Sequence, residues 1–336
     1  MIARRNNLEW LRLVFALQVV AEHAAEHLQT QVPVALAHFP GVPAFFFVSG
    51  LLVYSAYLNA PGRTYLENRF LRLFPGLLAV TLGGAAVALV AHGARDLLVH
   101  PGVYSTWALL QLTVGQAYNP ELFRDIGVGA MNGSLWTITT EIIFYACVPV
   151  IVRLERSFKH VVLVAIAASL LVYTLGPQWL RVNAYRSKSA YDILALTPLA
   201  WGWMFGFGIL AAKHFAALKR VSRYFPLLVL PMLLMMGYGD GALFGASGNR
   251  LGLVYFVCYA ALVFWLAFGV RYVPLAFDLS YGAYIWHMPI INLLLVLALP
   301  QFAVAVVLTI AVAGASWFLI EKPALRLKRK SMNPRT

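Results

Sequence analysis

Residues 8–27 read LEWLRLVFALQVVAEHAAEH, a run long and apolar enough for a membrane helix. Within this run, Arg12 and His23 stand eleven positions apart. At about 100° per residue, eleven steps return to nearly the same face, so both side chains line one side of the helix about 16 Å apart. Because charge inside a bilayer is costly and usually functional, we expect this side to face the protein interior.

The composition of the whole chain also indicates a membrane protein. Hydrophobic residues make up 61% of the chain and charged residues 12%, and the mean hydropathy is +0.75. These values are far from those of an average soluble domain. Runs long enough to cross about 30 Å of hydrocarbon predict an all-α, polytopic bundle of about ten transmembrane helices. The predicted spans lie near residues 9–28, 41–59, 73–92, 134–152, 160–176, 194–212, 224–239, 251–269, 279–298 and 301–320. The long connection from His92 to Gly133 could hold a short re-entrant or interfacial helix.

Positive charges predict the orientation, since short loops rich in Lys and Arg stay in the cytoplasm. With the N-terminus inside, nineteen Lys and Arg fall in predicted cytoplasmic segments and six in predicted external loops. This bias predicts that both termini are cytoplasmic, and it explains the net charge of +13 without a nucleic-acid partner. We expect one membrane domain over residues 1–325 and a basic cytoplasmic tail over residues 326–336 that contacts anionic membrane lipids.

Polar side chains within and beside the predicted spans form two groups. Arg12, Arg69 and Arg72 lie near the predicted cytoplasmic face, and guanidinium groups are suited to phosphate. His23 and Glu141 lie about 8 Å and about 10 Å below the predicted external ends of their helices. The sequence therefore predicts a two-ended site, with a cationic patch inside and a histidine and carboxylate centre farther out.

Six short blocks follow one another along nearly the whole chain. They are Arg12 and His23 with ten residues between them, FFFVSGLLV (45–53), Arg69-Phe70-Leu71-Arg72, GSLWTITTEIIFY (133–145), LSYGAYIWHMPI (279–290) and Glu321-Lys322-Pro323. In this order they resemble the motifs of the membrane acyltransferase-3 family of integral membrane O-acyltransferases, in its stand-alone form without an extra extracytoplasmic domain. The chain departs from the usual family pattern at Glu9, Trp10, Leu13 and Leu51, while the charged positions are intact.

The resemblance implies an enzyme of the cytoplasmic (inner) membrane. It would transfer an acyl group, usually acetyl, from cytoplasmic acyl-CoA to a hydroxyl of an extracytoplasmic carbohydrate or glycolipid. Acetyl-CoA would be the co-substrate, and no metal is expected. The phosphates of the donor would be held by Arg69, Arg72 and Arg12. Residues lining the substrate site would be Ser49, Ser134, Trp136, Tyr145, Tyr284 and His287.

The expected chemistry follows from the acceptor. A hydroxyl is a poor nucleophile at neutral pH, and imidazole is the natural general base, so we expect His23 in that role. Glu22 or Glu141 would orient its ring or stabilise the imidazolium. Direct transfer is the default, and an acyl-imidazole on His23 would give the same product in two steps. Ser49, Trp136 or backbone amides are candidate oxyanion stabilisers.

Other interpretations of these residues stay open. His287 could belong to a packed polar network, Ser49-Gly50 could be a small-residue helix contact, and Arg69 and Arg72 could be anchors at the membrane surface. The string His23-Ala24-Ala25-Glu26-His27 fits the H-x-x-E-H pattern of zinc hydrolases, although no third ligand is evident. A multi-spanning transporter is the other alternative, but the chain lacks repeat symmetry and Gly/Pro-broken helices in matching halves.

Overall fold

The computed structural model describes residues 5–116, 118–182, 194, 197–237 and 241–328. It is 75% helical, and no strand occurs among these residues, so the predicted all-α class is confirmed. The α-helices are α1 (Leu8–His27), α2 (Gly41–Asn59), α3 (Arg63–His92), α4 (Arg95–Val99), α5 (Pro101–Gln111), α6 (Trp136–Leu154), α7 (Val161–Val182), α9 (Pro198–Lys213), α10 (Phe215–Val221), α11 (Val229–Met235), α12 (Leu253–Phe268), α13 (Ser280–Val296), α14 (Phe302–Ser316) and α15 (Lys322–Arg326). Short 3-10 segments are η1 (Val34–His38), η2 (Glu121–Phe123), η3 (Gly133–Leu135) and η4 (Ser222–Leu228), and η5 (Trp317–Glu321) is a π-helix.

Several helices have the length and composition of membrane spans. Among the described residues, four stretches qualify: Val34–Asn59, Arg63–His92, Gly133–Leu154 and Phe302–Arg326. Shorter apolar helices cover Val161–Gly176 and Leu253–Phe268. Helix α1 has 20 residues, but Glu9, Arg12, Glu22 and Glu26 interrupt its apolar surface. The chain is a helical membrane protein, while the count of about ten spans and the cytoplasmic position of both termini stay predictions.

Helix α3 begins earlier than hydropathy predicts. It starts at Arg63 instead of residue 73, directly after Gly62, whose φ of 74° lies in the left-handed region. The added turns are polar, and Arg63 pairs with Glu67 across one turn at 2.6 Å. Consequently Arg69 and Arg72 lie within a helix and not in the loop before it, so their side chains have a defined direction.

The predicted span 224–239 is interrupted. The segment is divided into η4 and the seven-residue α11, and Pro226 and Pro231 lie within these two elements. Proline lacks the backbone N–H that would bond to the preceding turn, which explains why one continuous α-helix does not form here.

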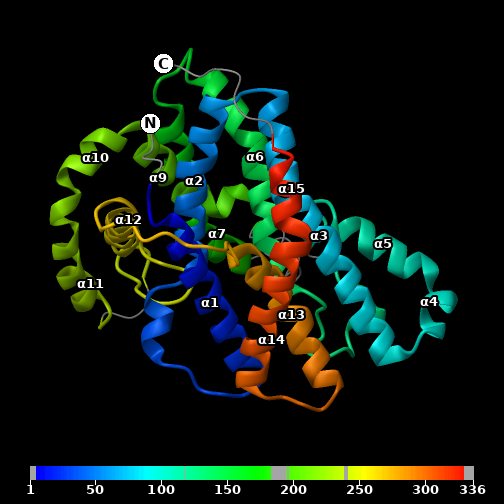
Figure 1. The fold of residues 1–336 in the computed structure, drawn as a ribbon. Coiled ribbons are helices and arrows are strands. Elements are labelled where there is room, and N and C mark those ends of the chain that lie inside the picture. Colours follow the sequence, from blue (N-terminus) through cyan, green and yellow to red (C-terminus); the bar gives the residue numbers. More distant parts are fainter. Residues whose placement is uncertain (1–4, 117, 183–193, 195–196, 238–240, 329–336) are drawn as a thin grey trace.

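Two short helices occupy the long connection after His92, as the composition allowed. Helices α4 and α5 pack with the loop that follows them around Trp107 and Phe123, whose ring centroids are 5.2 Å apart. The His92 ring lies within 3.3 Å of Asp96 and 3.2 Å of Asp125, which fastens the loop to the end of α3. Figure 1 shows α4 and α5 projecting from one flank of the bundle, opposite α10, α11 and α12.

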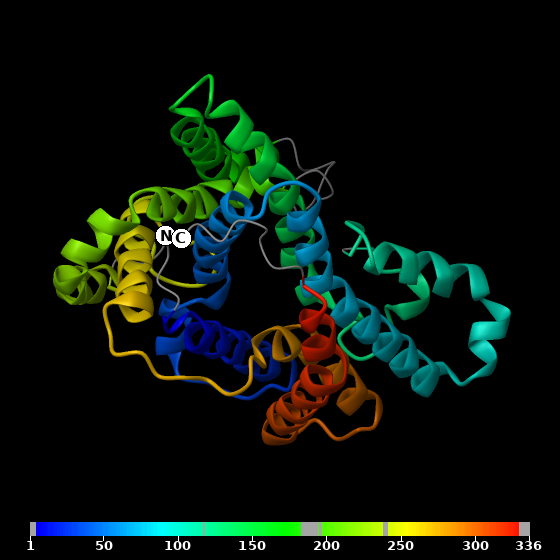
Figure 2. The same ribbon diagram turned by 45° about the horizontal axis from the view of Figure 1, so that its top comes forward.

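The central helices surround one site. Figure 2 shows α1, α2, α3, α6 and α13 around a common centre, with α15 beside α3. On the outer side of this ring, α2 packs closely on α9 through Gly50 and Gly208. A Cβ atom added to Gly50 would lie 2.0 Å from the Phe205 carbonyl oxygen, and one added to Gly208 would lie 2.1 Å from the Phe47 carbonyl oxygen. The small-residue helix contact considered for Ser49-Gly50 is therefore present.

Candidate active site

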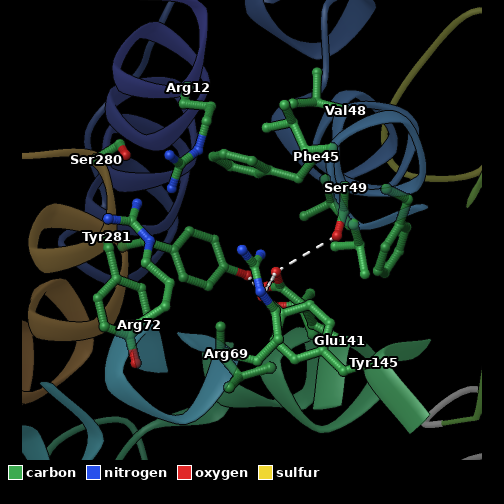
Figure 3. Close-up of a pocket in the computed structure, with 17 residues that line it drawn as sticks. Arg12, Phe45, Val48, Ser49, Arg69, Arg72, Glu141, Tyr145, Ser280 and Tyr281 are labelled. Atoms are coloured by element: carbon green, nitrogen blue, oxygen red, sulfur yellow. Dashed lines mark hydrogen bonds between the residues drawn. The ribbon is translucent and has the colours of Figure 1, made fainter. Parts of the chain in front are cut away.

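A cavity opens between α1, α2, α3, α6 and α13. It encloses about 800 Å³ of space, part of which is open to solvent. Seven of the predicted site residues line it: Arg12, Ser49, Arg69, Arg72, Glu141, Tyr145 and Tyr284. Figure 3 shows the three arginine side chains directed toward this space from α1 and α3. The structure therefore brings together residues from five of the six sequence blocks.

Two of the arginines share a carboxylate that the sequence interpretation missed. Arg72 Nη2 lies 2.8 Å and Arg12 Nη1 lies 3.3 Å from Asp278 Oδ2. Ser280 Oγ donates to the other carboxylate oxygen at 2.5 Å. Burial alone would raise the pKa of the Asp278 carboxyl, but Arg12 and Arg72 outweigh that effect and hold this pKa well below its usual range. Asp278 therefore stays ionised and fixes the two guanidinium groups at the cavity wall.

Arg69 is held differently from the other two arginines. Its guanidinium carbon lies 5.4 Å from the ring centroid of Tyr145 and 5.9 Å from that of Tyr65. Its Nε is buried and has no hydrogen-bond partner among the described residues. A buried donor without an acceptor is costly. Arg69 therefore keeps hydrogen-bonding capacity for an anionic ligand.

A fourth cation stands near the same group. Lys328 follows α15 and is half-buried, and the charges that act on its ammonium group are Arg72, Arg69, Arg12 and Asp278. Burial first, and then repulsion from the three arginines, lower the pKa of Lys328 to about 7. Its sequence position in a basic tail gave no sign of this environment. The rest of the predicted tail, residues 329–336, lies outside the described residues.

Glu141 belongs to the cavity and not to a histidine pair. Tyr145 Oη donates a short hydrogen bond to Glu141 Oε1, and Ser49 Oγ lies 3.4 Å from the same oxygen. Figure 3 shows this group on the side of the cavity away from Arg12. The carboxylate therefore faces two hydroxyl groups in a space that also holds three arginines.

His23 pairs with another histidine. Its Nδ1 lies 2.8 Å from Nε2 of His287, which is fully buried in α13. The same face of α1 also brings Arg12 to Asp278, which directly precedes α13, so the predicted shared face of Arg12 and His23 is confirmed. Neither histidine lines the cavity. Tyr284 connects the two regions, since it lines the cavity and its ring centroid is 5.9 Å from that of His287.

The carboxylates expected to orient His23 lie elsewhere. Glu22 forms a hydrogen bond with Gln18, one turn earlier on α1. Neighbouring residues of a helix point about 100° apart, so the Glu22 side chain does not share the direction of His23. Glu141 is hydrogen-bonded to Tyr145 and Ser49 and lines the cavity, which His23 does not. The sequence predicts a carboxylate beside His23, but the structure places a second histidine there.

Ser134 and Trp136 also differ from their expected place, since neither lines the cavity described here. Ser134 is buried, and its carbonyl oxygen accepts a hydrogen bond from Tyr284 Oη at 3.2 Å. Trp136 packs against Trp201 with ring centroids 5.2 Å apart. Ser134 lies in η3 and Trp136 begins α6, and their contacts are with Tyr284 and with Trp201 of α9.

The zinc-site alternative finds no support in the described residues. They contain no group of three or more His, Cys, Asp or Glu side chains arranged to hold a metal ion. The rings of His23 and His27 have centroids 6.2 Å apart, and Nδ1 of His23 already faces His287.

Comparison with known proteins identifies the family. A family model described as an acyltransferase domain matches residues 5–321. The chain belongs to the acyltransferase-3 family. This acyltransferase is 29% identical over 353 residues to nodulation protein 10 of Rhizobium leguminosarum bv. viciae, covering 96% of this chain and 94% of that protein. It is 25% identical over 335 residues to an O-acetyl transferase of Shigella phage Sf6, covering 95% of this chain and 96% of the phage protein.

No solved structure matches this acyltransferase significantly. The family assignment confirms the resemblance drawn from the six sequence blocks, and it favours an enzyme over the transporter alternative.

Proposed function

We propose that this acyltransferase moves an acyl group, most simply acetyl, from acyl-CoA on the cytoplasmic side to a hydroxyl of an extracytoplasmic carbohydrate or glycolipid. The setting would be the cytoplasmic membrane, with both termini in the cytoplasm. The observation that carries the proposal is the cationic cavity, one of whose lining residues, Tyr284, lies beside His287 of the histidine pair. The printed name of the phage relative, O-acetyl transferase, supports acetyl as the group transferred.

The donor end of the proposal rests on charge. Three arginines and Lys328 stand together, and Asp278 is the carboxylate that pairs with two of them. Guanidinium groups bind phosphate oxygens with paired, charge-assisted hydrogen bonds. Arg69 Nε is buried without an acceptor, which is the state expected of a ligand-binding donor before its ligand arrives. The phosphates of CoA would lie here, with the thioester arm extending toward Tyr284.

The transfer step needs one base. His23 would take the proton of the acceptor hydroxyl on its free ring nitrogen while the oxygen attacks the thioester carbonyl carbon. The carbon–sulfur bond then breaks, and the thiolate of CoA leaves and receives the proton from His23. The products are an ester and free CoA, so atoms and charges balance. The thioester would reach His23 past Tyr284, which lines the cavity and whose ring lies beside that of His287.

The test of the function is a search for the product. Surface glycans and lipids of cells with the intact protein, with a His23→Ala variant and without the protein would be compared by mass spectrometry. We expect a species heavier by one acyl unit only where the intact protein is present. A profile that is identical in all three cell lines would refute acyl transfer to these acceptors.

Arg69→Gln is expected to weaken binding of CoA. A hydrogen bond to a charged group contributes about 1.5–3 kcal/mol, so the loss should be about 10- to 100-fold in affinity. Titration calorimetry of the purified protein with CoA measures it. Arg63→Gln is the matched control on the same helix, because its side chain is 85% exposed and pairs only with Glu67 at the surface. Equal affinity of both variants and the intact protein would show that the donor binds outside this cavity.

Lys328 makes donor binding depend on pH. Its pKa of about 7 means that the ammonium group is charged below pH 7 and neutral above it. We therefore expect the affinity for CoA to fall by about tenfold between pH 7 and pH 9, as one charge–phosphate contact is lost. The phosphates cannot cause this change, since the second ionisation of a phosphate monoester occurs near pH 6. A Lys328→Arg variant should show a flat profile, because arginine stays charged. A steep fall that persists in this variant would exclude Lys328 as the cause.

A further inference from the structure

The histidine pair has a geometry that limits how each ring can be protonated. His23 Nδ1 and His287 Nε2 are 2.8 Å apart, and the ring centroids are 5.1 Å apart. A hydrogen bond between two neutral imidazoles has one N–H donor and one lone-pair acceptor. Either His23 donates from Nδ1 and keeps a lone pair on Nε2, or His287 donates from Nε2 and His23 carries its proton on Nε2.

The two arrangements differ in chemistry. With the proton on His23 Nε2, the exposed nitrogen of His23 could not accept a proton from an acceptor hydroxyl. With the proton on His23 Nδ1, the lone pair of Nε2 is free for that step. His287 must then accept at Nε2 and carry its own proton on Nδ1. A base role for His23 thus requires one tautomer of its neighbour.

The geometry points to His287 as the positioning residue of the reaction: by accepting the Nδ1 proton of His23 it fixes the ring and leaves Nε2 of His23 as the base. This inference rests on the proposed function and adds the group that orients the base. A buried carboxylate performs this task in serine hydrolases. Here the other titratable groups around the pair are His27 and Glu26 on α1 and Tyr284 on α13.

His287 is buried, and hydrogen bonds of its neighbours fix this part of α13. Its side chain is 0% exposed. Asn132 Nδ2 donates to the Ile285 carbonyl oxygen at 2.8 Å, and Asn292 accepts from the Val128 N–H at 2.8 Å. Tyr284 Oη lies 2.7 Å from Thr137 Oγ1. These bonds tie α13 to the segment before α6 and to α6 on both sides of His287, so they fix the part of α13 that carries its ring.

A neutral imidazole has a consequence that a carboxylate would not have. His287 offers the positive charge that forms on His23 during transfer a hydrogen bond but no opposite charge. A carboxylate in place of His287 would favour the protonated form of His23 and raise its pKa. The acidic limb of the rate profile, where His23 becomes protonated, would then move to higher pH.

The experiment compares three substitutions in the full-length protein, reconstituted in lipid with acetyl-CoA as donor. His287→Phe keeps a ring but removes the acceptor, His287→Gln replaces Nε2 by an amide oxygen, and His287→Glu supplies a carboxylate. We expect kcat to fall about 10²- to 10³-fold in His287→Phe. The kcat of His287→Gln should be at least about tenfold higher than that of His287→Phe. In His287→Glu, the acidic limb of the rate profile should move upward by about one pH unit. Affinity for CoA should stay unchanged in all three, since His287 does not line the cavity.

Three results would overturn the inference. These are a normal kcat in His287→Phe, equal losses in the Phe and Gln variants, and an unshifted pH profile in an active His287→Glu variant. Variants that melt at lower temperature but bind CoA normally still report on kcat, so misfolding does not hide the answer. Failure of the proposed function is separate, because it would appear as no acyl transfer by the unmodified protein.

Discussion

His23→Ala is expected to reduce acyl transfer by about 10³-fold while leaving donor binding intact. A positioned general base contributes about 10²- to 10⁴-fold to a rate, and alanine supplies no proton acceptor. Binding should survive, because His23 does not line the cationic cavity. The measurement is turnover of radiolabelled acetyl-CoA by the protein in lipid, together with calorimetric titration of CoA.

The matched control for this prediction is His27→Ala. His27 lies one turn farther along α1, and its ring centroid is 6.2 Å from that of His23. It is half-buried and makes no described hydrogen bond to His287. We expect transfer by His27→Ala close to that of the intact protein. Normal turnover by His23→Ala would show that His23 takes no part in the reaction. Loss of CoA binding in that variant would show that His23 belongs to the donor-binding site.

Gly50→Val is expected to destabilise the protein by at least about 2 kcal/mol, because overpacking of a tight contact forces backbone shifts. Even the first carbon of a side chain would lie 2.0 Å from a backbone oxygen of α9 and 3.2 Å from the Cα of Gly208. Backbone atoms cannot turn aside as a flexible side chain can, so α2 and α9 must separate. Because Ser49 and Phe45 on α2 line the cavity, this separation should also weaken CoA binding. The loss of stability is measured by thermal unfolding of the protein in detergent, monitored by size-exclusion chromatography.

Gly314→Ala is the control for the packing argument. Gly314 lies in α14, and an added Cβ would meet no atom within 4 Å. Alanine there should leave stability unchanged or raise it by up to about 1 kcal/mol, because glycine is a poor helix former. Equal melting temperatures for Gly50→Val and Gly314→Ala would contradict the close approach of α2 and α9.

Local periodicity accounted for most of what could be predicted from this chain. The shared face of Arg12 and His23 follows from helical geometry alone, and the structure confirms it. Hydropathy located the apolar helices but misplaced the start of α3. The first turns of that helix are polar, and their helical state depends on residue preference and the Arg63–Glu67 pair instead of burial. The family resemblance placed Arg69, Arg72 and Glu141, all of which line the cavity.

The missed residues are those whose roles depend on distant segments. Asp278 stands 266 positions from Arg12, and its only sign in the sequence is that it directly precedes the LSYGAYIWHMPI block (279–290). Lys328 belongs to a run of basic residues in which no member stands out. Analogy with a catalytic triad predicts a carboxylate partner for His23. Helix packing instead brings His287 beside it, from 264 positions away.

The sequence alone determined that this protein is a helical membrane protein of the acyltransferase-3 family and that Arg12 and His23 share a helix face, because hydropathy, helical period and motif order are properties of neighbouring residues. Only the tertiary structure decided which groups meet. It placed Asp278 between two arginines, His287 against His23, and Tyr284 at the cavity wall beside His287. The reason is physical. The position of a residue in a helix sets the direction of its side chain, but the packing of α13 against α1 and α3 sets the distances between the arginines and Asp278 and between the two histidines.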